Sequence, residues 1–92
     1  MKKYYVYIMT NNSGTLYVGM TNNLRRRIAE HKEMRIEGFT KRYKINKLIY
    51  FEEYDDVRYA IERETRIKTW SRRKKLDLIA TLNPNWEEIN TF

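Results

Sequence analysis

Three short stretches of the chain are rich in β-branched and aromatic residues, a pattern typical of β-strands. They span residues 4–9, 15–20 and 48–54. The first two are separated by residues 11–14, Asn-Asn-Ser-Gly, which have the composition of a turn and predict a β-hairpin. The third stretch begins apolar on both faces, so we expect a strand that is central in the sheet or covered on both sides.

The register of the hairpin follows from the alternation of its side chains. Pairing Ile8 with Leu16 places the aliphatic residues of both strands on one face, whereas a slip by one residue would turn them to the other face. The same register sets Tyr7 opposite Tyr17 on the second face, which they share with Gly19. We therefore expect the two phenols to be direct neighbours.

Three amphipathic segments predict helices, each preceded by residues that cap helix N-termini. They cover residues 24–32, 57–70 and 72–82, and follow the polar residues at 21–23, 55–56 and 71. Asn83 and Pro84 end the last helix. The spacing of its apolar residues predicts a packing face of Leu76, Ile79 and Leu82, followed by a docking tail with Trp86, Ile89 and Phe92. These elements predict one α/β domain, residues 1–92, of the α+β type.

Arg27 and His31 lie one turn apart in the helix of residues 24–32, on the side that faces the core at about 100° per residue. Arg25, Arg26 and Glu30 point elsewhere, and Arg26 and Glu30 have the spacing of an i,i+4 ion pair on a solvated surface. A histidine at a helix end often interacts with the last carbonyl groups, which is the alternative role for His31. Its place beside Arg27 favours a functional role.

Glu64 falls within the apolar stripe of the helix of residues 57–70, where Val57 and Ile61 are expected to pack. An unpaired buried charge is costly, so such a carboxylate is paired with a cation or binds a metal ion. The sequence leaves both alternatives open: a salt bridge to Arg27 or Lys68, or a metal site.

The chain is strongly basic, with 19 Lys and Arg against 12 Asp and Glu and a formal net charge of +7 over 92 residues. Such a balance favours a polyanionic partner, and an inert basic surface is the alternative. Two segments concentrate the charge: residues 41–47, where aromatic residues are interleaved, and residues 72–75 at a helix N-terminus. The candidate nucleic-acid-binding residues in these segments are Lys41, Arg42, Lys44, Arg72, Arg73 and Lys74.

Several classes of function are excluded by composition. The chain has no cysteine and one histidine, which rules out disulfides, thiol catalysis and a zinc site of Cys or His ligands. A bound metal must therefore be held by oxygen. The apolar run of residues 4–9 after Lys2 and Lys3 is too short for a signal peptide or a membrane span, so we expect a cytoplasmic protein without membrane contact.

The five candidate catalytic residues have side chains that suit phosphodiester hydrolysis. They are Tyr7, Tyr17, Arg27, His31 and Glu64. A single carboxylate with several waters can hold Mg²⁺, and an arginine can neutralise charge that develops on phosphorus. A tyrosine or the histidine can act as general base toward water.

The spacing of these residues resembles the GIY-YIG endonuclease superfamily, in particular its small stand-alone bacterial single-domain members. The resemblance rests on Tyr5-Val6-Tyr7, Tyr17-Val18-Gly19, Arg27-x-x-x-His31 and Glu64, and extends to the segments of residues 67–72 and 83–86. It implies a three-stranded antiparallel sheet flanked by helices. By this resemblance Tyr7 and Tyr17 are the sheet tyrosines of the site, Arg27 stabilises the phosphate, His31 is the helix histidine and Glu64 binds Mg²⁺ or Mn²⁺.

Two features depart from the family pattern or extend it. Tyr5 replaces the first glycine of the signature, which adds bulk near Tyr7. Some members also carry an asparagine after the glutamate, and Asn83, Asn85 and Asn90 all remain candidates for it.

The function expected from this resemblance is metal-dependent endonucleolytic cleavage of DNA, with structured or damaged DNA as substrate. The sequence leaves RNA open as a substrate. A noncatalytic nucleic-acid-binding module is the first alternative, because the basic segments alone would explain it. A nuclease subunit that needs a protein partner for targeting is the second, because larger relatives take their specificity from additional domains.

Overall fold

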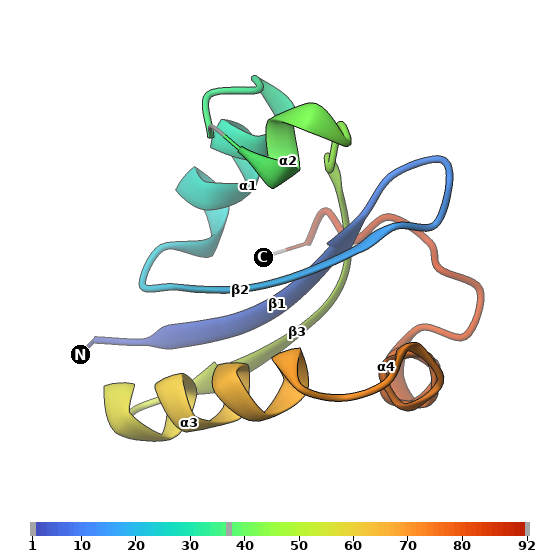
Figure 1. The fold of residues 1–92 in the computed structure, drawn as a ribbon. Coiled ribbons are helices and arrows are strands. Elements are labelled where there is room, and N and C mark those ends of the chain that lie inside the picture. Colours follow the sequence, from blue (N-terminus) through green and yellow to red (C-terminus); the bar gives the residue numbers. More distant parts are fainter. Residues whose placement is uncertain (1, 37, 92) are drawn as a thin grey trace.

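The computed structural model describes residues 2–36 and 38–91. A three-stranded antiparallel sheet with the order β2-β1-β3 forms its centre (Figure 1). The strands are β1 (Tyr4–Thr10), β2 (Leu16–Thr21) and β3 (Lys47–Tyr54). The predicted strands and the antiparallel sheet are confirmed. The central strand is β1, so the third strand is not central. The alternative that it is covered on both sides is confirmed, because residues of β3 pack into both cores.

The hairpin register differs from the predicted one by two residues. Tyr7 pairs with Gly19, and Met9 pairs with Tyr17. Alternation fixes only which residues share a face, so Tyr7 and Tyr17 stay on one face but lie diagonally. The turn selects this register because the Asn11 side chain accepts hydrogen bonds from the backbone N–H groups of residues 13 and 15, at 2.9 and 3.0 Å. Asn11 thereby stabilises a longer loop than predicted.

The helices are α1 (Leu24–Lys32), α2 (Phe39–Arg42), α3 (Val57–Lys68) and α4 (Arg72–Leu82). Side-chain caps begin three of them, because Asn23, Asp56 and Ser71 each accept a hydrogen bond from a backbone N–H in the first turn. The predicted bounds of α1 and α4 are confirmed. The short helix α2 was not predicted, and α3 ends two residues before the predicted Trp70.

Helices cover both faces of the sheet: α1 and α2 lie on one face, and α3 and α4 lie on the other (Figure 1). The buried face of α3 consists of Ala60 and Ile67, whereas Ile61 is 48% exposed. In α4 Ile79 is buried and Leu82 is 55% exposed. The predicted packing stripes were therefore wrong at Ile61 and Leu82, and also at Val57, which is 36% exposed. Contact with the sheet, and not the apolar pattern alone, sets which face is buried.

The C-terminal tail is held along β3 at a β-bulge. Ile49 is the extra residue of this bulge, since Tyr50 pairs with Ile8 and Leu48 with Met9. Asn83 donates a hydrogen bond of 3.0 Å from its amide nitrogen to the carbonyl oxygen of Ile49. The backbone N–H of Ile89 donates to the carbonyl of Leu48 at 2.9 Å, so the tail satisfies two acceptors of the edge strand β3.

The docking predicted for the tail is confirmed at Trp86 and Ile89, which pack against the cores, while Phe92 lies outside the described residues. Within the described part of the chain, no helix has the length and apolar character needed to cross a membrane.

Candidate active site

Tyr7 is the buried centre of the candidate site. Its side chain projects from the central strand toward β2 and is 1% exposed. It lies over Gly19, its partner in the ladder: a Cβ on Gly19 would be 2.5 Å from both Cζ and Oη of the phenol. Only a residue without a side chain leaves this space, so Gly19 allows the phenol to cross the outer strand.

Three rings meet at this point, from β1, β2 and α1. The ring centroids of Tyr7 and Tyr17 are 6.3 Å apart, and His31 lies 5.8 Å from Tyr7 and 5.5 Å from Tyr17. His31 is 2% exposed, and its Nε2 is 3.1 Å from the Tyr7 hydroxyl oxygen. The structure therefore brings together three of the five predicted catalytic residues, and His31 faces Tyr7 instead of the last carbonyls of its helix.

Burial controls the protonation of this pair. Burial, helped by the positive charge of Arg27, lowers the pKa of His31 to about 4, so the imidazole is neutral at pH 7. Burial raises the pKa of Tyr7 well above its ordinary value, and the charges of Tyr17, Glu64 and Glu30 act in the same direction while Arg27 opposes them. At neutral pH the pair is a protonated phenol next to a neutral imidazole.

Arg27 lies at the rim of the site. Its side chain is 37% exposed, and its Nη1 donates to Glu30 at 3.2 Å. Its Nε is buried and has no hydrogen-bond partner among the described residues. The expected Arg26–Glu30 pair is present at 4.0 Å, but the shorter contact shows that Glu30 also orients Arg27, a role that the sequence did not indicate.

Glu64 lies on α3, which covers the face of the sheet opposite to α1. Its side chain is 22% exposed, and its Oε2 is 3.3 Å from Nζ of Lys68, one of the two salt-bridge partners that the sequence left open. The charge of Glu64 still contributes to the raised pKa of Tyr7.

A divalent cation at Glu64 would have few protein ligands. Among the described residues, no group of three or more acidic, His or Cys side chains is placed to hold a metal. Mg²⁺ is often bound by one or two carboxylates with waters and substrate phosphate as its other ligands. The partly exposed Glu64, paired with a Lys68 side chain that is 50% exposed, suits that mode of binding.

The two basic segments meet at the β1–β2 turn. Asn11 donates from its side-chain amide to the carbonyl of Tyr43 at 2.6 Å, and Arg72 donates from Nη1 to the carbonyl of Gly14 at 2.8 Å. Segments that are far apart in the sequence therefore converge on one loop. In the second segment, Arg73 pairs with Asp77 at 3.4 Å and Lys74 lies over the ring of Trp70 at 4.4 Å.

Aromatic side chains connect the first basic segment to the site. The rings of Tyr17 and Phe39 stack with centroids 6.3 Å apart, and Phe39 contacts Tyr43 at 4.6 Å. The sequence indicated aromatic residues among basic ones here, but it did not indicate their contact with Tyr17.

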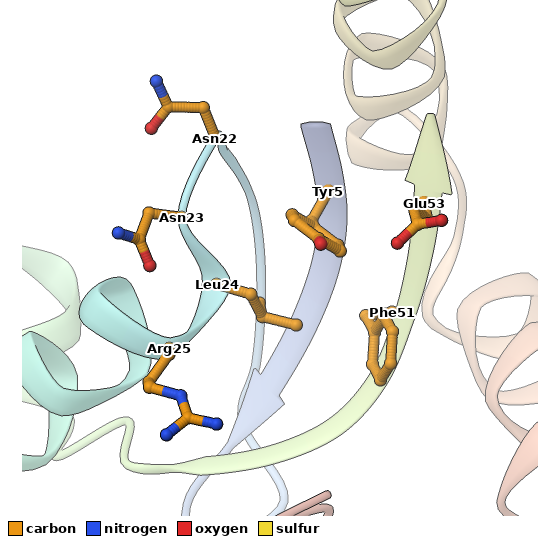
Figure 2. A pocket seen from close by; sticks show the side chains of 7 residues that line it. All are labelled: Tyr5, Asn22, Asn23, Leu24, Arg25, Phe51 and Glu53. Carbon is orange, nitrogen blue, oxygen red and sulfur yellow. The ribbon is translucent and has the colours of Figure 1, made fainter. Parts of the chain in front are cut away.

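A cavity of about 350 Å³ opens beside the start of α1. Figure 2 shows Tyr5 and Phe51 facing it from neighbouring strands, with Leu24 pointing toward their rings. The Tyr5 and Phe51 centroids are 6.2 Å apart, edge to face. Tyr5 stands where the family signature has a glycine, and its bulk forms a wall of this cavity. None of the five candidate catalytic residues lines it.

Fold and site together define the class of protein. Residues 3–77 match the GIY-YIG catalytic domain family, and the chain belongs to this family. Because the GIY-YIG family acts on nucleic acids, membership implies a nuclease.

Curated proteins that are similar to this chain carry the family name UPF0213. One from Staphylococcus saprophyticus is 39% identical over 80 residues, which are 87% of this chain and 98% of that protein. One from Clostridium perfringens is 40% identical over 90 residues, 94% of this chain and 97% of that protein. The solution NMR structure of the UPF0213 protein BH0048 from Bacillus halodurans matches with a TM-score of 0.62 and 28% identity, over 92% of this chain and 90% of that one.

Proposed function

We propose that this protein is a metal-dependent endonuclease that hydrolyses phosphodiester bonds in DNA, with structured or damaged DNA as its substrate. The observation that carries the proposal is the hydrogen-bonded pair of Tyr7 and His31, buried at one point of the sheet and influenced by the charges of Arg27 and Glu64. A purely structural core has no need of a phenol hydrogen-bonded to an imidazole with a guanidinium at its rim.

In this proposal the residues divide the chemistry. The protonated hydroxyl of Tyr7 and the neutral Nε2 of His31 are within hydrogen-bond distance, so His31 can accept a proton through Tyr7 as water attacks phosphorus. The bond from phosphorus to the leaving sugar oxygen breaks in the same displacement, and that oxygen takes up a proton from solvent. Tyr17 packs against both rings and holds their orientation. Arg27, with its partly exposed guanidinium, neutralises the charge that builds on the phosphoryl oxygens.

Glu64 would hold the Mg²⁺ or Mn²⁺ ion, with Lys68 released from its ion pair. An ion there would act as a Lewis acid on the phosphate and lower the pKa of bound water. The net charge of +7 and the convergence of the basic segments on the β1–β2 turn support binding of a polyanion next to this site.

Nicking of supercoiled, branched and single-stranded DNA by the purified protein tests the proposal. We expect cleavage in Mg²⁺ or Mn²⁺, none in EDTA, and a loss of at least about a hundredfold in Glu64→Gln, the size typical of a catalytic group. Glu62→Gln is the matched control, because Glu62 forms an equivalent i,i+4 pair with Arg66 on the same helix. Equal activity in wild type and Glu64→Gln would refute the assigned role.

A noncatalytic nucleic-acid-binding module is the second candidate, and the ion pair between Glu64 and Lys68 favours it. In that case DNA binds with equal affinity in EDTA and Mg²⁺, and no substrate is cut under any condition. A requirement for a protein partner would instead appear as cleavage that is recovered only when native extract is added. RNA substrates in the same assay decide between DNA and RNA.

A further inference from the structure

A continuous run of aromatic rings leads from the candidate site to the surface. It begins at Tyr17, continues to Phe39 with ring planes inclined by 25°, and ends at Tyr43, whose centroid is 4.6 Å from that of Phe39. The guanidinium carbon of Arg42 lies 5.6 Å from the centroid of Tyr43 and closes the run with a cation. We call Tyr17, Phe39 and Tyr43 the aromatic run.

The outer two rings are exposed although the segment that carries them is anchored. Phe39 is 46% exposed and Tyr43 is 42% exposed, whereas Thr40 and Ile45 beside them are buried at 3% and 0%. The carbonyl of Tyr43 also accepts the hydrogen bond from Asn11. The fold therefore fixes the backbone of this segment and presents two large apolar rings to solvent, which marks an interaction surface.

The chemistry around the run identifies what it would bind. Stacked rings bind flat apolar faces, and the neighbouring Arg42 and Lys44 attract phosphates. In a duplex the base faces are covered by neighbouring bases, so only an unpaired base offers a free face to such rings. A protein partner would not need the flanking positive charge, which makes a nucleic acid strand the better match.

We propose that the aromatic run is a platform on which unpaired bases of single-stranded DNA stack, next to the phosphate that is cut. The proposal rests on the proposed nuclease function and specifies its substrate: a strand with unpaired bases beside the scissile bond. Since Tyr17 contacts both Tyr7 and His31, a base stacked on Phe39 lies one ring away from the reacting groups.

Binding without cleavage tests the platform separately from the nuclease activity. In EDTA, fluorescence anisotropy would compare a labelled oligothymidine, an abasic strand of the same length and a duplex of the same length. We expect the oligothymidine to bind most tightly, and Phe39→Ala or Tyr43→Ala to weaken it by about five- to a hundredfold, the range for loss of one base stack. Binding of the abasic strand should change less than twofold in these variants.

Tyr59→Ala is the matched control, because Tyr59 is 60% exposed and has a guanidinium 6.0 Å from its ring, yet it lies on α3 outside the run. Tyr43→Phe should bind like wild type, since it keeps the ring. The comparison of oligothymidine with the abasic strand on the wild-type protein needs no variant, so a misfolded variant does not block the test.

Equal affinity of wild type for oligothymidine and the abasic strand would overturn the proposal, as would unchanged oligothymidine binding in folded Phe39→Ala and Tyr43→Ala. If the platform result holds and no strand is cut in Mg²⁺, the nuclease function fails while the single-strand platform stands. If strands are cut but oligothymidine and the abasic strand bind with equal affinity, the platform proposal is refuted and the nuclease function stands.

Discussion

The phenol of Tyr7 occupies the space in which a side chain of Gly19 would lie, with both Cζ and Oη 2.5 Å from the position of a Cβ. The second glycine of the signature thus has a steric function: it lets a buried tyrosine of the central strand reach the outer strand. Gly19→Ala should displace the phenol, lower the free energy of unfolding by about 1–3 kcal/mol and abolish cleavage.

The measurement for Gly19→Ala is chemical denaturation together with the nicking assay. Gly38→Ala is a useful comparison, because nothing lies within 4 Å of a Cβ there, although its φ of 86° makes it strained. A Gly19→Ala protein with unchanged stability and activity would show that the ring of Tyr7 moves aside at no cost.

Tyr7→Phe removes the hydroxyl and leaves Nε2 of the buried His31 without this partner. We expect a loss of about 1–3 kcal/mol in unfolding free energy and a much larger proportional loss of cleavage rate. Tyr4→Phe, on the opposite face of the same strand, is the control. Retained cleavage in a stable Tyr7→Phe protein would exclude the hydroxyl from the reaction.

His31 predicts how stability depends on pH. Its pKa of about 4 in the folded protein lies below the ordinary 6.5, so between these values the unfolded chain binds the extra proton. The contribution of the neutral His31 to the free energy of unfolding, about 3 kcal/mol, is fully present above pH 6.5 and is lost as the pH falls toward 4. Chemical denaturation at several pH values in this range would give the free energy of unfolding, which should decrease less with acid in His31→Gln than in wild type. An identical decrease in both proteins would contradict the burial of a neutral imidazole.

A second polar cluster stabilises the fold away from the site. Arg63 donates two hydrogen bonds of 2.9 Å to Glu52, which also accepts from Tyr54. Burial alone would raise the pKa of Glu52, but these hydrogen bonds outweigh it and hold the pKa below its ordinary value. Arg63→Met should therefore destabilise the protein by about 2–3 kcal/mol, less than for a fully buried pair.

Cleavage by Arg63→Met, measured well below its melting temperature, should equal that of wild type. Arg63 and Glu52 bond to each other, and Glu52 also bonds to Tyr50 and Tyr54, none of which is a candidate catalytic residue. A strong loss of activity at full folding would place the cluster within the functional surface.

Of the three asparagines considered from the sequence, Asn83 has a structural role that the hydrogen bonds define: it holds the C-terminal tail. Its amide donates to the carbonyls of Ile49 and Glu87, and its oxygen accepts from the backbone N–H of Glu87. Asn83→Ala should cost about 2–3 kcal/mol and increase hydrogen exchange at the amide of Ile89. Asn85→Ala, at an exposed position, should change neither.

Local signals account for what the sequence predicted well. The helix starts depend on side-chain caps, in which Asn23, Asp56 and Ser71 bond to the first turn of the helix that follows each of them. Because cap and turn are neighbours in the sequence, the sequence alone predicts these starts. The strands and the shared face of Tyr7 and Tyr17 follow from two-residue alternation. The family signature then connects the candidate residues, although their roles stay predictions.

The features that were missed depend on contacts between distant segments. The register depends on the Asn11 side chain, which no alternation rule contains. The exposure of Ile61 depends on where α3 meets the sheet. Glu30 was assigned to the surface because helical angles alone do not show that it reaches Arg27. Each miss has the same physical origin, since packing chooses among arrangements that local patterns leave equivalent.

The β1–β2 turn has a consequence for how this chain can vary. Because Asn11 holds one basic segment and Gly14 holds the other, the length of this loop sets the separation of two patches of positive charge. Under the proposed function, adding or removing residues in the loop should change the spacing of the phosphates that bind both patches, while Tyr7 and His31 keep their positions. A change in loop length would then alter which substrate shapes the protein prefers, and would leave the catalytic groups unchanged.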